Sequence, residues 1–222
     1  MPSYARNHQL KHSLVYHAYS RSCNRKVIFS QPDDFEHFKQ LLRDYKARFE
    51  MKIYHWVIMS NHYHLVIELM RPEEISKFMA GLHRAYAYYH HRAYGTVGFL
   101  WQGRFKLQPI QKELYLRSCG RYVERNPVRA GMVNEACEYK YSSANYYCLG
   151  LLDSLTNPDP YYLDLSNDQN KRKEEYRRFL HDFDSEEERY FQRIDFPCGS
   201  AEFLKRLVFK DRHLFPRRRG RA

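Results

Sequence analysis

Residues 51–69, MKIYHWVIMSNHYHLVIEL, contain two runs of β-forming residues joined by a short polar pair. The runs MKIYHWVIM (51–59) and HYHLVIEL (62–69) are rich in aromatic and β-branched residues, which favour strands. Ser60 and Asn61 form a tight connector between them. The stretch therefore predicts a β-hairpin, and the rest of the fold is built outward from it.

The segments on either side of this hairpin alternate between strand and helix patterns. Prolines in a first turn and glycines after a last turn mark where helices start and stop, and the residue before a proline avoids the α conformation. In chain order the sequence predicts a strand at 12–20, a helix opened by Pro32, the hairpin, a helix from Pro72 to Gly95, a strand at 99–110, and a helix from about Lys112 that ends at or before Pro127.

The order β-α-β-β-α-β plus one helix predicts the ferredoxin-like, split βαβ arrangement of the α+β class, with two helices on one face of an antiparallel sheet. After about residue 149 the sequence becomes rich in Pro, Asp, Asn and Ser before further helical stretches follow. We expect a first domain at residues 1–149 and a mainly helical C-terminal extension with a basic tail at residues 150–222.

The charge balance favours an anionic partner. The 222 residues include 37 Lys and Arg against 26 Asp and Glu, a formal net charge of +11. Residues 150–222 carry 15 basic and 14 acidic residues, so the surplus belongs mainly to residues 1–149. Aromatic residues make up 16% of the chain, and cations interleaved with aromatic rings suit single-stranded nucleic acid.

The cysteines and the N-terminus indicate a cytoplasmic protein. The five cysteines are odd in number and show no CxxC spacing, which is not the pattern of a disulfide framework or of a thiolate zinc site. Residues 1–13 lack the apolar core of a signal peptide. No apolar run approaches the roughly 20 residues that a membrane span needs, so we expect no membrane partner.

The second strand of the hairpin places two imidazoles on one face of the sheet. Side chains alternate along a strand, so His62 and His64 share a face with Val66, while Leu65 and Ile67 lie on the opposite, apolar face against the helices. Residues two apart lie about 7 Å from each other at Cα, close enough to bind one divalent metal. Histidines on strands are also often only hydrogen-bonded, so a metal site needs a third ligand.

The helix predicted from Lys112 offers candidates for that ligand. Tyr115, Cys119, Tyr122 and Asn126 follow helical spacing and form one stripe. The stripe is explained equally by contact with the sheet and by a site. If it covers the histidine face, Tyr122 could supply a nucleophile and Asn126 an oxygen ligand of the kind that Mg²⁺ or Mn²⁺ prefers.

Four motifs resemble one family. NHYHLVI (61–67) resembles the His-hydrophobic-His motif of HUH single-strand endonucleases, and YVERNPVRAGMV (122–133) resembles the tyrosine-helix motif of the REP-associated tyrosine transposases, which are related to the single-tyrosine insertion-sequence transposases. VYHAYSRSCNRKVIF (15–29) and LWQGRFK (100–106) are similar to flanking segments of the same family. The resemblance spans roughly residues 10–147, with the motifs in order.

The resemblance implies an enzyme that nicks and joins single-stranded or hairpin DNA at palindromes through a 5′-phosphotyrosine bond. It implies that His62 and His64 are metal ligands, that Tyr122 is the nucleophile, and that Asn126 matches the third ligand. It further implies Mg²⁺ or Mn²⁺ as cofactor and a nucleoid-associated protein. Tyr63 is bulkier than the residue usual in the motif, and we expect the core to accommodate it.

Basic residues near these motifs are candidates for DNA binding. Each could also be an ordinary solvated charge. The set comprises Arg21, Arg25, Lys26, Arg84, Arg104 and Lys106, together with Arg217, Arg218 and Arg219 of the basic tail.

Two other functions stay open at this point. A non-catalytic palindrome- or RNA-binding protein could have the same order of elements, since RNA-recognition domains stack bases on sheet aromatics. A zinc hydrolase could use the two histidines with a bound water, although no third histidine or carboxylate stands beside them in the sequence. The sequence also leaves open whether the protein is a monomer or a homodimer.

Overall fold

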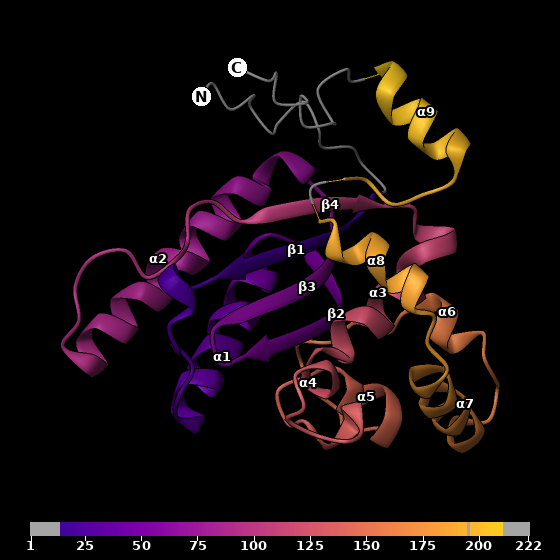
Figure 1. Ribbon diagram of the computed structural model, residues 1–222, viewed down its shortest axis with the longest axis horizontal. Coiled ribbons are helices and arrows are strands. Elements are labelled where there is room, and N and C mark those ends of the chain that lie inside the picture. The colour runs from indigo at the N-terminus through magenta and orange to yellow at the C-terminus, as the bar shows by residue number, and fades with distance from the viewer. Residues whose placement is uncertain (1–13, 195, 211–222) are drawn as a thin grey trace.

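The structure is a computed structural model that describes residues 14–194 and 196–210. Its sheet contains β1 (Val15–Arg21), β2 (Met51–Met59), β3 (His62–Leu69) and β4 (Lys106–Ile110), in the order β2-β3-β1-β4 (Figure 1). Each strand runs antiparallel to its neighbours. This topology confirms the predicted ferredoxin-like fold of the α+β class.

The hairpin forms where the sequence predicts it. Met59 pairs with His62 directly across the turn, and β3 lies between β2 and β1. The register of β2 shifts once, between Ile53 and His55. The histidine-bearing strand is therefore an interior strand whose backbone is fixed on both sides.

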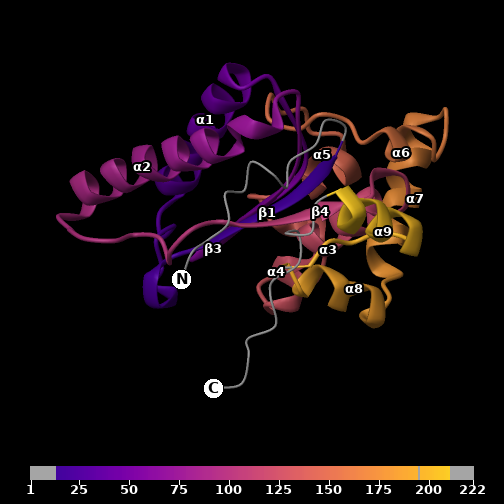
Figure 2. The same ribbon diagram turned by 90° about the horizontal axis from the view of Figure 1, so that it is seen from above.

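Helices α1 (Pro32–Arg48) and α2 (Ile75–Tyr94) cover one face of the sheet (Figure 2). Asp34 holds the start of α1, because its carboxylate accepts hydrogen bonds from the backbone N–H groups of Ser30 and Gln31. Gly95 ends α2 in the left-handed conformation, at φ 62°. The β3 residues on this face, which include Leu65 and Ile67, are fully buried against the two helices, as predicted.

Helix α3 (Lys112–Glu124) and the short helix α4 (Asn126–Arg129) lie on the opposite face (Figure 2). Val66 of β3 and Val57 of β2 are buried there together with Cys119 and Tyr122 of α3. The helix ends before Pro127, as the sequence predicts. The predicted stripe of α3 thus covers the face of the sheet that carries the histidine pair.

The fourth strand is shorter than predicted. It begins at Lys106 rather than at residue 99, and Trp101 makes only an isolated bridge with Ser22. Gly103 has a φ of 68°, a turn conformation that interrupts the extended chain. Pro109 is tolerated in β4 because β4 is the outermost strand of the sheet, and the bond on its outer edge uses the Pro109 carbonyl, which accepts from Cys198 N–H at 2.9 Å, so no proline N–H is needed.

The remaining helices follow α4 in sequence. They are α5 (Ala144–Leu149), α6 (Pro160–Leu163), α7 (Gln169–His181), α8 (Ser185–Gln192) and α9 (Ala201–Lys210). Short 3₁₀ turns lie elsewhere in the chain, at Cys23–Arg25, Pro72–Glu74 and Ala136–Glu138. Phe191 of α8 is buried in the same apolar cluster as Tyr122. The C-terminal extension is thus mainly helical, while its division from the first domain at residue 149 stays a prediction.

None of the helices in the described parts of the chain has both the length and the apolar character to cross a membrane. All five cysteines are free thiols.

Candidate active site between the histidine pair and the tyrosine helix

His62 and His64 project from β3 toward α3, and the structure brings Tyr122 to them. The His62 and His64 ring centroids lie 5.3 Å apart. The Tyr122 ring centroid lies 5.9 Å from that of His64, with the two planes nearly perpendicular. The Asn126 side chain lies close enough to the His62 ring to act on its pKa. The side chains that strand alternation and helical spacing place on facing surfaces therefore lie together at one site, as the sequence leads us to expect.

The surroundings of both histidines keep them neutral. The pKa of His62 is lowered to about 4, chiefly by burial and also by the positive charges of Arg21 and Arg129, against a smaller opposite effect of Asn126. Burial also holds the pKa of His64 well below its usual value, with His17, His62 and Arg129 acting in the same direction. Neutral imidazoles have a free ring-nitrogen lone pair, which is the form that binds metals.

Tyr122 is enclosed, with only 7% of its surface exposed. Burial raises the pKa of its phenol to about 12, while the charge of Arg129 works in the opposite direction. The Arg129 guanidinium carbon lies 4.2 Å from the centroid of the Tyr122 ring. Phe191 of α8 packs against the same ring at 5.6 Å between centroids. The phenol is thus protonated at neutral pH and sits between a cation and an apolar wall.

The donor set fits a divalent cation. Two neutral imidazoles and the carboxamide oxygen of Asn126 combine nitrogen and oxygen ligands of the kind that Mn²⁺ and Mg²⁺ accept. Across the described residues, no group of three or more His, Cys, Asp or Glu side chains is arranged to hold a metal ion. A cation at this site would therefore rely on Asn126, and on substrate or water oxygens, beyond the two histidines.

Tyr115, the other tyrosine of the α3 stripe, is not part of this group. Its ring lies 6.4 Å from that of Phe191, and Cys198 and Tyr190 of the C-terminal extension contribute to its raised pKa after burial. The structure thus distinguishes two tyrosines that helical spacing alone treats as equivalent.

The predicted DNA-binding residues are spread over several surfaces. Arg21 ends β1 with its guanidinium carbon 5.4 Å from the centroid of the Tyr19 ring, which in turn lies beside His64. Arg25 and Lys26 follow in the exposed turn after β1, and Arg104 and Lys106 are exposed around the start of β4. Arg217, Arg218 and Arg219 lie outside the described residues.

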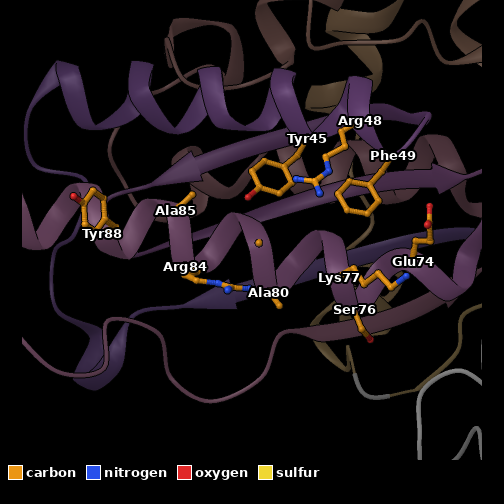
Figure 3. Close-up of a pocket in the computed structure, with 11 residues that line it drawn as sticks. Tyr45, Arg48, Phe49, Glu74, Ser76, Lys77, Ala80, Arg84, Ala85 and Tyr88 are labelled. Atoms are coloured by element: carbon orange, nitrogen blue, oxygen red, sulfur yellow. The ribbon is translucent and has the colours of Figure 1, made fainter.

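Arg84 lies away from the histidine pair. It is exposed on α2, within the helical layer that covers the other face of the sheet. There it lines a groove of about 1040 Å³ together with Arg48, Lys77 and Tyr88 (Figure 3). DNA held at the histidine pair would therefore need a separate path to reach Arg84.

Several side chains at the site were not found by sequence reasoning. His17 of β1 is hydrogen-bonded to His64 at 2.7 Å, and Asn61 of the hairpin turn is hydrogen-bonded to His62 at 2.6 Å. Gln108 of β4 reaches His17, and Arg129 covers Tyr122. Asn61 and Arg129 have a local signal, since Asn61 directly precedes His62 and Arg129 follows Tyr122 within the same motif, while His17 and Gln108 are brought in by strand pairing.

The comparisons with known proteins agree with this fold. The family model described as "Transposase IS200 like" matches residues 10–126. No protein among the curated sequences matches the chain. The solved structure of a REP-associated tyrosine transposase bound to a REP hairpin has the same fold, with a TM-score of 0.56 and 20% sequence identity over 72% of this chain and 93% of that chain.

The matched region takes in β1, the hairpin, β4 and α3, and it ends at Asn126. It includes both histidines and Tyr122, and it makes up more than half of the chain. On this match the chain belongs to the family of IS200-like transposases.

Proposed function

We propose that the chain is a metal-dependent endonuclease and strand transferase that acts on single-stranded DNA at palindromic hairpins. The observation that carries this proposal is the position of the Tyr122 ring beside His64, with Asn126 reaching His62 from the next turn of the same helical region. A phenol beside a cluster of metal-ligand side chains is the arrangement needed for nucleophilic attack on a polarised phosphate.

In the proposed reaction, the phenolic oxygen of Tyr122 attacks the scissile phosphorus. The bond from phosphorus to the 3′ oxygen breaks, and a bond from phosphorus to the tyrosine oxygen forms. The phenol loses one proton and the departing 3′ oxygen gains one, so the step needs no oxidant and no nucleotide cofactor. Attack by a 3′-hydroxyl of another strand reverses the step and joins the DNA.

His62, His64 and Asn126 would hold Mg²⁺ or Mn²⁺. When bound, the cation would neutralise charge on the scissile phosphate as the reaction proceeds. Arg129 supports the same step from the protein, because its charge lowers the pKa of Tyr122 and thereby favours the phenolate.

Hairpin DNA is the substrate that the family and the solved neighbour suggest, since that neighbour is bound to a REP hairpin. Arg21, Arg25 and Lys26 stand at the end of β1 on the approach to the histidine pair, where they could contact phosphates. The basic surplus of residues 1–149 is consistent with this partner.

A protein that binds palindromes without cutting them is the second candidate, and the 7% exposure of Tyr122 favours it. RNA recognition on the sheet is less well supported, because α3 buries the central part of the face that would have to stack bases.

The test is to incubate the protein with Mn²⁺ and a single-stranded hairpin labelled on the 3′ side of the cleavage site, and to look for labelled protein after denaturation. We expect a covalent adduct with the wild type and none with Tyr122→Phe, which should still bind the hairpin. Tyr115→Phe is the matched control on the same helix and should form the adduct. His64→Ala should bind DNA but neither cut it nor form the adduct.

Other outcomes would decide against the proposal. Cleavage without an adduct in the wild type would favour a hydrolase that uses water. Hairpin binding with neither cleavage nor adduct would favour the non-catalytic candidate. An adduct that persists in Tyr122→Phe and disappears in Tyr115→Phe would assign the nucleophile to Tyr115.

A further inference from the structure

Each histidine of the pair has its Nδ1 atom engaged by a neighbouring side chain. His62 Nδ1 lies 2.6 Å from Asn61 Oδ1, and His64 Nδ1 lies 2.7 Å from His17 Nε2. A neutral imidazole carries one proton, and its position decides which ring nitrogen has a free lone pair. The partners of Nδ1 therefore determine which nitrogen can bind a cation.

The orientation of the Asn61 amide settles the tautomer of His62. Asn61 Nδ2 donates to the backbone carbonyl of Arg25 at 3.0 Å. A carbonyl can only accept, so the NH₂ group must face it and the Oδ1 atom must face His62. That oxygen accepts from Nδ1–H of His62, which leaves His62 Nε2 unprotonated.

The tautomer of His64 is fixed in the same way, with His17 as an intermediate between His64 and the amide that sets the orientation. Gln108 Nε2 donates to the backbone carbonyls of Tyr190 at 2.9 Å and Phe196 at 2.7 Å. Gln108 Oε1 therefore faces His17 Nδ1, at 3.3 Å, and accepts its proton. His17 Nε2 is then the acceptor for Nδ1–H of His64, which leaves His64 Nε2 unprotonated.

The Asn126 amide also presents its oxygen. Its Nδ2 atom donates to the backbone carbonyls of Tyr122 at 3.2 Å and Val123 at 2.9 Å, so Oδ1 is the atom available to the His62 ring. The group thus gathers two bare imidazole nitrogens and one carboxamide oxygen. Grouped lone pairs with no proton among them are best satisfied by a cation.

We propose that Asn61 and the Gln108–His17 pair are positioning residues that hold His62 and His64 as Nδ1–H tautomers, so that both Nε2 atoms are ready to bind the divalent cation. This inference rests on the metal site of the proposed function. The carbonyls that orient Gln108 belong to Tyr190 and Phe196, so the C-terminal extension takes part in setting the tautomer of His64.

Long-range ¹⁵N–¹H spectra of histidine-labelled protein identify the protonated ring nitrogen without metal or DNA. With the His62 and His64 signals assigned from His62→Gln and His64→Gln, we expect both rings to carry the proton on Nδ1. Asn61→Leu should release the tautomer of His62 only, and Gln108→Leu should release the tautomer of His64 only. A signal from Nε2–H of either ring in the wild type would overturn the inference.

Mn²⁺ affinity, measured by calorimetry without DNA, is the second readout. Loss of a hydrogen-bond partner behind a ligand typically costs about 10–100-fold in metal affinity, and we expect this for Asn61→Leu and Gln108→Leu. Asn61→Asp keeps an oxygen at His62 Nδ1 while losing the bond to Arg25, so it should retain most of the affinity. Gln102→Leu, at an exposed glutamine before β4, is the control that should change nothing.

Double-mutant cycles test whether Asn61 acts on His62 independently of the path from Gln108 through His17 to His64. His17→Ala combined with Gln108→Leu should cost no more Mn²⁺ affinity than the larger single change, because both act on His64 through one path. Asn61→Leu combined with Gln108→Leu should be additive, because the two act on different histidines. Full additivity in the first pair would contradict the inference.

These measurements are independent of DNA cleavage. Wild-type protein with Nδ1–H tautomers and tight Mn²⁺ binding, but no adduct on hairpin DNA, would leave this inference standing and refute the proposed reaction. Adduct formation by a protein whose histidines carry Nε2–H would refute this inference alone.

Discussion

The guanidinium of Arg129 lies over the Tyr122 ring and is held there by Glu188, whose Oε1 atom is 3.1 Å from Arg129 Nη1. Its charge also reaches the pair of imidazoles, where it lowers the pKa of both His62 and His64. One cation therefore favours two states that the proposed reaction needs, neutral imidazoles and a more acidic phenol. The residue belongs to the same NPVR segment that ends the tyrosine helix.

Replacing Arg129 should slow formation of the tyrosine adduct. The phenol has a pKa of about 12, so below that pH the phenolate fraction rises about tenfold per pH unit. Arg129→Gln removes a charge that lowers this pKa, so the phenolate fraction at any given pH must fall. We expect single-turnover adduct formation to be about tenfold slower between pH 7 and 9, still rising with pH.

Arg117→Gln is the matched control for this change. Arg117 lies on α3, and its guanidinium carbon is 4.7 Å from the ring centroid of Phe179. It should leave the rate and its pH dependence as in the wild type. Equal rates for the Arg129 and Arg117 variants would remove Arg129 from the reaction.

Helix α3 is fixed on the sheet by a buried polar cluster next to Tyr122. Glu124 accepts hydrogen bonds from His55 of β2 at 2.9 Å, Ser143 at 2.6 Å and Tyr176 of α7 at 2.8 Å. The other ring nitrogen of His55 lies 3.1 Å from Asp159. Burial alone would lower the pKa of His55, but Glu124 and Asp159 raise it to about 9, so the ring bridges two carboxylates as a cation.

Gly120→Ala should disturb this contact and move Tyr122. A Cβ at Gly120 would lie 2.5 Å from the His55 ring, which cannot turn away while two carboxylates hold it. Overpacking of this kind costs about 1–3 kcal/mol. We expect a lower free energy of urea-induced unfolding and slower adduct formation, because α3 must shift away from β2 to relieve the clash.

Gly81→Ala provides the comparison. A Cβ there would lie equally close to Tyr45, but that ring is only half-buried at the groove between α1 and α2 (Figure 3) and can move outward. The cost in unfolding free energy should therefore be smaller, and adduct formation should be unchanged. A larger effect at Gly81 than at Gly120 would show that α3 is not held as tightly as these contacts imply.

Across the fold, the positions that follow from local periodicity can be predicted from the sequence, whereas contacts between distant residues cannot. Strand alternation places His62 and His64 on one face, and helical pitch puts Tyr122 and Asn126 on one stripe, so the sequence predicts their meeting. The contact between His17 and His64 joins residues 47 apart, and the contact between His55 and Asp159 joins residues 104 apart. Neither has a periodic signal, because each exists only once the strands have paired and the extension has folded back.

The C-terminal extension supplies polar partners to the tyrosine helix as well as apolar cover. Arg121 is paired with Glu187, and Glu188 Oε1 lies 3.3 Å from Arg125 Nε. The Arg125 and Glu188 side chains are almost fully buried. A buried charge left without its partner typically costs about 3–5 kcal/mol, so these pairs make the helix dependent on residues after 150.

A chain that ends at residue 149 should therefore be much less stable than the full chain. The truncation would take Tyr176 and Asp159 from the Glu124–His55 cluster, Glu188 from Arg125, and Phe191 from the ring of Tyr122. Several buried charges and one apolar surface would lose their partners together, so we expect no cooperative urea transition by circular dichroism and no Mn²⁺ binding. The stability of the Glu188→Gln variant of the full chain should lie between those of the full and the truncated chain, with a cooperative urea transition at a lower midpoint. If residues 1–149 unfolded cooperatively and bound Mn²⁺ as the full chain does, they would be the independent domain that the sequence predicts, and the extension would have no part in holding α3.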